Sequence, residues 1–140
     1  MTAGPKEEAK THYQRVLKRS PASAAVMNNV AYLICETGGN LTEALGLAQM
    51  AIQKAPQRAD FADTLGWVYL KQKNTSAALQ IFERLLRQYP KNATFHYHAA
   101  LAFLGKADRK KAVSELEAAL ISGPEKYEER RIRDLLKEIS

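Results

Sequence analysis

Apolar side chains recur at helical spacing along most of the chain, in paired stripes separated by short polar turns. In one pair, Leu65, Val68 and Tyr69 form a first stripe, because residues three and four apart share a helix face. The second stripe of that pair consists of Ala78, Leu79, Phe82, Leu85 and Leu86. No stretch alternates like a strand between turn signals, and no apolar run is long enough to cross a membrane. The pattern predicts an all-α chain built from helix pairs.

A fixed period organises these pairs. Pro56, Pro90 and Pro124 close three successive stretches at intervals of 34 residues. The same step separates three small residues inside the stripes, namely Ala44, Ala78 and Ala112. A period of this size is typical of stacked units that bury a continuous core only together. Such arrays present extended surfaces for partners, which favours a binding protein over an enzyme.

Small residues lie where two helices must approach closely. They are Ala31 and Ala44, Gly66 and Ala78, and Ala100 and Ala112. A larger side chain there would overpack the helix pair, at a cost of about 1–3 kcal/mol. The turns between helices, at Gly38-Gly39-Asn40, Asn74-Thr75 and Lys106-Ala107-Asp108, each supply a breaker or an N-cap. Each proline of the period is expected to end a second helix, because it lacks an N–H donor.

The residues within each period resemble the tetratricopeptide pattern, a helix-turn-helix of 34 residues. The middle unit carries the resemblance through Leu65, Gly66, Tyr69, Ala78, Phe82, Leu85 and Pro90. The third unit does so through Ala99, Ala100, Phe103, Ala112, Leu116, Ala119 and Pro124. The first unit does so through Val30, Ala31, Ile34, Ala44, Ala48, Ala51 and Pro56, with one extra glycine in its turn. Ala9, Tyr13, Val16, Leu17 and Pro21 fall in the same register and resemble the second helix of a unit without its first helix.

The resemblance implies an α-α superhelix of about three full repeats, preceded by a half repeat and closed by a capping helix. The expected segments are a disordered start (1–5), a partial repeat (6–21), three repeats (24–58, 59–92 and 93–126) and a capping helix (124–140). In the last segment Pro124 suits the first helical turn, and an apolar stripe from Ile132 to Ile139 faces a charged side. A chain that opens halfway through a repeat suggests the C-terminal part of a longer protein.

Charge adds little to this interpretation. The 21 Lys and Arg residues exceed the 15 Asp and Glu residues and give a formal net charge of +6. No aromatic residues interleave with the basic ones as a base-stacking platform requires, so we expect a solvated basic surface and no nucleic-acid partner. The mixed charges of the last segment also argue against membrane insertion. No secretory signal is visible at the start, and the compartment, cytoplasmic or periplasmic, stays open.

Catalytic chemistry has few candidates. His96 and His98 lie two apart on a predicted helix, so they point in different directions and cannot share a metal. Asp60 and Asp63 share a helix face, but nothing indicates the raised pKa that acid-base catalysis needs. Cys35 stands alone without an obvious cationic neighbour, which indicates a small apolar residue rather than a reactive thiol. We therefore expect no enzyme, no cofactor and no metal.

The resemblance also implies which residues face the groove, because the first helix of each repeat lines it. The first repeat contributes Asn28, Asn29, Tyr32 and Glu36. The second contributes Asp60, Asp63, Thr64, Trp67 and Lys71, with Leu70 beside them, and the third contributes Thr94, Tyr97, His98 and Leu101. Two interpretations of Trp67 stay open. It is either an exposed anchor for a partner or a residue that packs against the helix of a neighbouring repeat.

Chaperone-binding members of the family hold a terminal carboxylate with cations in the groove. The matching positions here carry Asn28, Tyr32, Thr64, Thr94 and His98 instead. Asp60 and Asp63 would also repel an acidic tail. The partner expected from this comparison has a basic or neutral extended segment.

Two functional hypotheses follow. The first is a protein-binding scaffold within a larger bacterial assembly protein, because the segments NNVAYLICETGGNLTEAL and ADTLGWVYLKQ resemble bacterial proteins that accompany exopolysaccharide export and protein sorting. The second is a structural repeat segment that continues a longer superhelix or forms a homodimer. In that case Ala9, Tyr13 and Val16 of the half repeat would be exposed and would pair with a second chain.

Overall fold

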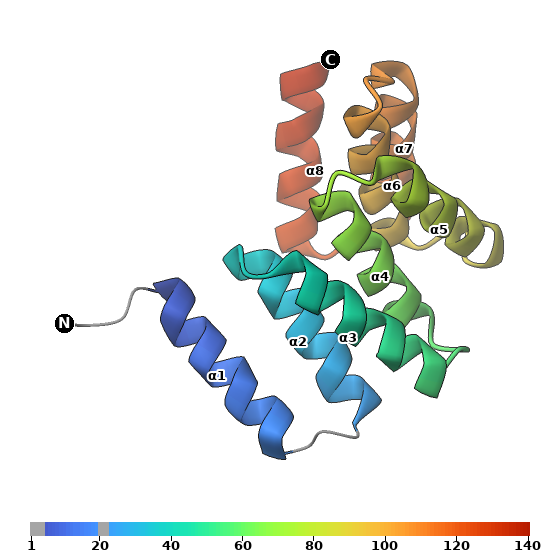
Figure 1. Cartoon of the computed structure of the whole chain (residues 1–140). Helices are drawn as coiled ribbons and strands as arrows, with labels where there is room; N and C mark the ends of the chain where they lie inside the picture. The colour runs from blue at the N-terminus through green and yellow to red at the C-terminus, as the bar shows by residue number, and fades with distance from the viewer. Residues whose placement is uncertain (1–4, 20–22) are drawn as a thin grey trace. The chain divides into compact units, whose positions relative to one another are not determined.

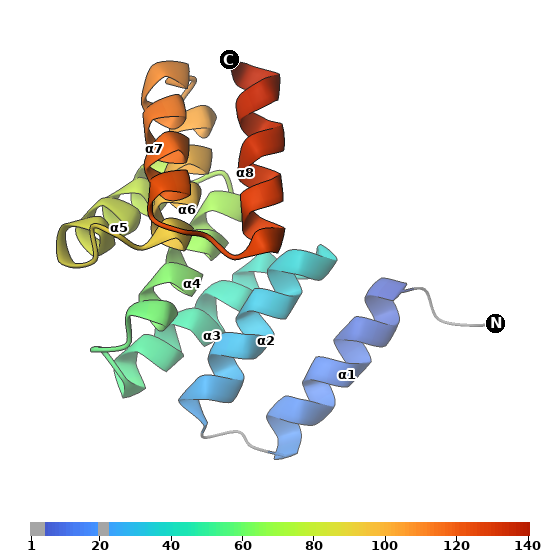
Figure 2. The ribbon, with the colours of Figure 1, turned by 180° about the vertical axis from the view of Figure 1, so that it is seen from behind.

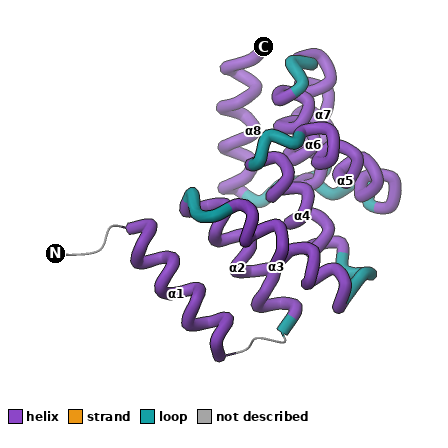
Figure 3. The backbone as a smooth tube through the Cα atoms, in the orientation of Figure 1, coloured by secondary structure: helices purple, strands orange, loops and turns teal. Residues whose placement is uncertain are grey.

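The computed structural model describes residues 5–19 and 23–140, which form eight α-helices and no strand (Figures 1 and 3). The helices are α1 (Pro5–Arg19), α2 (Ala24–Thr37), α3 (Leu41–Lys54), α4 (Ala59–Lys71), α5 (Thr75–Gln88), α6 (Ala93–Gly105), α7 (Arg109–Ile121) and α8 (Lys126–Ile139). None of these described helices has the length and apolarity to span a membrane. The predicted all-α class is confirmed.

The boundary between the first two expected segments differs from the prediction. Pro5 already begins α1 rather than ending a disordered start, as proline suits a first helical turn. Residues 1–4 of that start lie outside the described residues, as does Pro21 of the partial repeat.

The chain divides into two compact units, Met1–Gln72 and Lys73–Ser140. The first unit holds α1 to α4. There α2 and α3 form a helical hairpin, α1 lies along α2, and α4 packs on both hairpin helices (Figures 1 and 2). Met27, Ala51 and Phe61, one from each of α2, α3 and α4, form a buried cluster. Leu17 of α1 packs against the same cluster.

Tyr13 of α1 is buried, with only 2% of its surface exposed. Its ring reaches the α2–α3 turn, where a Cβ added to Gly39 would lie 3.3 Å from the Tyr13 hydroxyl and 3.1 Å from Ile34 Cγ2. Burial raises the pKa of Tyr13, and the carboxylates of Glu43 and Glu7 raise it further. The glycine inserted in this turn therefore gives the tyrosine room. The expectation that Tyr13 is exposed for a second chain is wrong, because α2 and its turn already cover it.

The second unit holds α5 to α8. There α6 and α7 form a hairpin, α5 packs on α6, and α8 packs on α7. Ile132 of α8 is fully buried in a cluster with Ala100, Leu116 and Ala119. The partly buried Leu135, Leu136 and Ile139 extend this contact. The apolar stripe of the last helix thus packs against the core of its own unit.

The start of α8 differs from the prediction. Pro124 precedes the helix, and Glu125 takes the N-cap position in an extended conformation (φ −64°, ψ 154°). The chain reaches it through Gly123, which is in the left-handed region with φ 79°. Glu128 and Glu129 then occupy the first turn, where carboxylates complement the positive end of the helix dipole.

Local capping explains most of the other helix starts. The side chains of Asn40, Asn74 and Asp108 each accept a hydrogen bond from a backbone N–H of the first turn, as predicted. Ser23 and Asn92 cap α2 and α6 in the same way. Each such cap contributes about 1 kcal/mol. The predicted close-approach positions are also buried, since Ala31, Ala44, Ala78, Ala100 and Ala112 have no exposed surface and Gly66 is buried as well.

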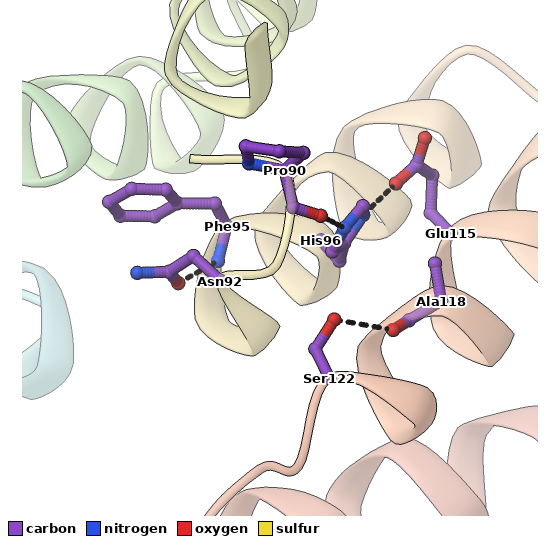
Figure 4. A network of polar contacts seen from close by, with 7 residues as sticks. All are labelled: Pro90, Asn92, Phe95, His96, Glu115, Ala118 and Ser122. Carbon is purple, nitrogen blue, oxygen red and sulfur yellow. Dashed lines mark hydrogen bonds and ion pairs between the residues drawn. The ribbon is translucent and has the colours of Figure 1, made fainter. Parts of the chain in front are cut away.

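His96 joins three parts of the second unit (Figure 4). Its Nδ1 lies 2.6 Å from Glu115 Oε2 of α7, and its Nε2 lies 2.7 Å from the carbonyl oxygen of Pro90 in the α5–α6 turn. Both partners are hydrogen-bond acceptors, so the ring donates to both only when both nitrogens carry protons. At the end of the same α7, the Ser122 hydroxyl donates to the Ala118 carbonyl at 2.9 Å.

Three equivalent turns share one backbone conformation. Gly38, Lys73 and Ala107 follow α2, α4 and α6 at matching repeat positions, and their φ angles are 71°, 65° and 60°. Only the first is a glycine, the residue that adopts this region without steric cost. A glycine therefore marks this turn geometry in the sequence only at Gly38. Lys73 and Ala107 adopt the same backbone conformation without a glycine.

We expect Ala107→Gly to raise and Gly38→Ala to lower the free energy of unfolding, each by about 1 kcal/mol. The reason is that a Cβ is disfavoured at positive φ. Urea denaturation of each variant measures the change. Gly46, which is helical and has open space around its Cα, provides the control, because Gly46→Ala should stabilise through helix propensity instead. Loss of stability in Ala107→Gly would contradict the expectation.

We expect Glu115→Ala to lower the free energy of unfolding by about 1–3 kcal/mol, because it leaves the half-buried His96 ring without its carboxylate partner. Glu117 lies on the same helix, is exposed and serves as the control. The change at Glu117→Ala should stay within about 0.5 kcal/mol. Equal effects in urea denaturation would show that the His96–Glu115 contact contributes nothing.

Candidate interaction face

The residues expected in the groove of the first unit lie on one side of α2 and one side of α4. Asn28, Asn29, Tyr32 and Glu36 recur at spacings of one, three and four residues on α2. Asp60, Asp63, Thr64, Trp67 and Lys71 do so on α4. The two helices contact each other, and Trp67 of the α4 row donates to Glu36 of the α2 row, so the two rows are neighbours. We call them together the α2–α4 face.

Trp67 forms the base of the α2–α4 face. Its side chain is only 7% exposed, and its Nε1–H donates to Glu36 Oε1 at 3.1 Å. The Lys71 ammonium lies 4.6 Å from the centre of the ring, a cation–π distance. The expectation of an exposed anchor is therefore wrong. Instead Trp67 joins α4 to the first helix of the preceding repeat, as the alternative interpretation held.

Asp60 forms an ion pair with Arg58 at the N-terminus of α4. Arg58 donates to both carboxylate oxygens of Asp60, at 2.9 and 2.7 Å. These hydrogen bonds lower the pKa of Asp60. A general acid needs the opposite shift, so Asp60 is unsuited to acid-base chemistry. Sequence reasoning missed Arg58, although its position two residues before Asp60 at the helix N-terminus was the available signal.

Two polar side chains are buried at this face. Thr64 is 7% exposed, and its hydroxyl donates to the Asp60 carbonyl at 3.1 Å. Asn28 is 8% exposed, and its Oδ1 has no hydrogen-bond partner within the described residues. The next residue, Asn29, is exposed, and Tyr32 is 46% exposed. The face thus combines a buried base with a polar and aromatic rim.

The groove positions of the third repeat lie in the second unit, and its own helices contact them. The Thr94 hydroxyl donates to the Glu128 carboxylate of α8 at 3.1 Å. Tyr97 lies beside Arg131 of α8; burial raises the pKa of Tyr97, and the hydrogen bond from Arg131 offsets part of that shift. His98 is 8% exposed, with ring centroids of Phe82 and Tyr97 at 5.6 and 5.8 Å. Leu101 is half-buried. Sequence reasoning did not connect α8 with these positions.

His96 and His98 point to different surroundings, as predicted from their spacing. His96 contacts Glu115 and Pro90, whereas His98 contacts two aromatic rings. Within residues 5–19 and 23–140, no three His, Cys, Asp or Glu side chains gather as a metal site would require.

Cys35 is a buried thiol near the base of the face. Burial raises its pKa from 9.0 to about 11. Contrary to the expectation, a cationic neighbour exists: Lys71 lowers the pKa, but burial outweighs it. Since the neutral thiol is favoured in the folded state, this contribution to stability is present below pH 9 and is lost as the pH rises toward 11.

We expect iodoacetamide to alkylate Cys35 in the folded protein at pH 8 at least roughly 100-fold more slowly than a free cysteine, because the thiolate is the nucleophile. Mass spectrometry of timed samples measures the rate. The same protein unfolded in urea is the control and should react at the rate of a free thiol. Equal rates in both states would contradict the buried, neutral thiol.

Comparison with known proteins agrees with the repeat pattern. One tetratricopeptide repeat family model matches residues 37–102 and 69–139, and a second matches residues 1–59. Among curated proteins, none matches the chain.

Several solved structures share the fold. TTC0263, a thermophilic TPR protein of Thermus thermophilus, is 21% identical with a TM-score of 0.80, over 96% of this chain and 72% of that one. The type III secretion translocator chaperone SycD of Yersinia enterocolitica is 22% identical with a TM-score of 0.70, over 83% and 90%. MamA of Desulfovibrio magneticus is 18% identical with a TM-score of 0.68, over 99% and 85%. With the family models matching most of its length, the chain belongs to the tetratricopeptide repeat family.

Proposed function

We propose that this protein is an interaction scaffold that binds an extended peptide segment of a partner protein on the α2–α4 face. The observation that carries the proposal is the contrast within that face between a fixed base and an accessible rim. Trp67 and Thr64 are buried and hydrogen-bonded, whereas Asn29 and Tyr32 reach solvent. A rim held on a rigid base loses little conformational entropy when a partner binds.

The chemistry of the rim favours particular partners. Tyrosine offers a large contact area with few rotatable bonds, and asparagine both donates and accepts hydrogen bonds. The two rows carry three carboxylates, those of Glu36, Asp60 and Asp63, against one ammonium group, that of Lys71. Arg58 beside them neutralises Asp60, so one negative charge remains in excess. Basic or neutral segments therefore fit better than an acidic C-terminal tail.

The proposal extends to the kind of protein in which this chain acts. SycD is a translocator chaperone of a bacterial secretion system, so the same helical repeat fold serves a protein-handling role there. A place within a larger bacterial assembly protein suits the present chain for the same reason. Self-association through α1 is the weaker alternative, because Tyr13 is buried and only the half-buried Ala9 and Val16 would be left to support it.

We expect Tyr32→Ala to weaken peptide binding by about tenfold or more, because truncating a central aromatic residue of an interface costs more than about 1 kcal/mol. An array of short peptides with basic, neutral and acidic compositions serves as the probe, and fluorescence anisotropy gives the affinities. Basic and neutral peptides should bind, and acidic C-terminal peptides should not.

Tyr89→Ala is the matched control, since Tyr89 is 45% exposed and lies in the other unit. Its affinities should stay within about twofold of the unsubstituted protein. Urea denaturation of both variants separates loss of contact from loss of fold. Equal losses at the two tyrosines, or no peptide bound by the unsubstituted protein, would reject the proposal.

A further inference from the structure

Three large apolar side chains of the second unit are exposed, and all three flank its turns between repeats. They are Tyr89, Ile121 and Tyr127, with 45%, 88% and 69% of their surface exposed. Tyr89 is the C-cap of α5, Ile121 is the last residue of α7, and Tyr127 is the second residue of α8. The exposed apolar surface of this unit is therefore gathered at the α5–α6 turn and the α7–α8 turn.

These two turns lie side by side. Asn92 of the α5–α6 turn lies beside Ser122 at the end of α7 (Figure 4), and both turns line a hollow of about 410 Å³. A second hollow of about 350 Å³, largely apolar, is formed by residues 89–92 of the α5–α6 turn. We call the two turns, together with the three exposed apolar side chains, the turn edge.

The repeat fold does not require apolar side chains at these positions. The equivalent residues, one or two periods of 34 residues away, are small or polar: Gln53 and Arg87 for Ile121, Ala55 and Gly123 for Tyr89, and Ala59 and Ala93 for Tyr127. The same helices and turns form with those residues. An apolar patch that the fold does not need, with polar residues around it, is typical of a protein interaction surface.

The turn edge is complementary to itself. The α7–α8 side carries the protruding Ile121 and the exposed carboxylate of Glu125, whereas the α5–α6 side carries the apolar hollow and the exposed ammonium group of Lys91. A twofold axis sets each side of one copy against the other side of a second copy. Ile121 of each copy then enters the hollow beside Tyr89 of the other, and Glu125 of each copy meets Lys91 of the other.

We propose that the turn edge is the contact between two copies of this chain in a twofold-symmetric dimer. A second copy fits better than an unrelated protein, because one surface supplies both halves of each apolar and charged contact. The interface is small, so the dimer is weak and reversible. This dimer does not involve α1, and it does not depend on peptide binding by the α2–α4 face.

Analytical ultracentrifugation over a range of protein concentrations tests the proposal. The unsubstituted chain should convert reversibly from monomer to dimer as its concentration rises. Ile121→Arg gives the third repeat the residue that the second repeat carries at this position. This change should raise the dissociation constant of the dimer by about tenfold or more, because a charge cannot enter the apolar hollow without cost.

Met50→Arg is the matched control, since Met50 is 46% exposed on α3 in the other unit. It should leave the dissociation constant within about twofold of the unsubstituted chain. Urea denaturation of both variants should show unchanged stability, because both side chains are exposed. A monomer at every concentration would overturn the proposal and leave the turn edge to a different protein. A dimer that Ile121→Arg does not weaken would also overturn it, because the contact would then lie on another surface.

Exchange of two charges tests the twofold arrangement. Lys91→Glu alone and Glu125→Lys alone should each weaken the dimer at low salt, because each change sets like charges against each other twice. The double variant should restore the dimer, as a double-mutant cycle requires of a direct contact. Failure of the double variant to dimerise better than either single variant would overturn the arrangement.

Discussion

No helix hairpin in this chain can bury its apolar side alone, and every other feature of the structure depends on that constraint. The α2–α3 and α6–α7 hairpins each carry alanines without exposed surface on both helices, Ala31 and Ala44 in the first and Ala100 and Ala112 in the second. Small side chains let the paired helices approach closely. The larger side chains then remain for contacts with the next helix, as Phe61 of α4 shows by packing on Met27 and Ala51. Stability is therefore shared between neighbouring repeats, as in other repeat arrays.

The sequence predicts well whatever repeats locally. The helix pairs, the caps at Asn40, Asn74 and Asp108, and the buried alanines all follow from short-range patterns. The sequence predicts poorly the burial of side chains that lie between helices distant in the chain. Tyr13 is buried because an inserted glycine makes room for it. Trp67 is buried on α4, which packs on α2 and α3, and its Nε1–H donates to Glu36 of α2. The repeat register predicts which side of its helix a residue occupies. How deeply its side chain is buried there depends on the helix that packs against that side.

The same limit explains the candidate face. Register places Trp67 and Asn29 on one side, although only Asn29 reaches solvent. In the second unit, contacts from α8 to Thr94 and Tyr97 occupy positions that register alone would assign to a partner. An unpaired atom such as Asn28 Oδ1 has no sequence signature at all, because it is defined by the absence of a neighbour. The repeat register thus gives only candidate groove residues. Their exposure and their hydrogen-bond partners then show which of them a partner can contact.

The fit between Tyr13 and Gly39 bears on how interchangeable the repeats are. In an idealised array, any unit could be exchanged for another, since all share the same interfaces. Here the turn of the first repeat is shaped to the side chain of the segment before it, and a Cβ at Gly39 would crowd that side chain. The tyrosine and the inserted glycine therefore form one structural unit that spans a repeat boundary. Rearranging the array by recombination, in nature or in protein engineering, would have to move the two together.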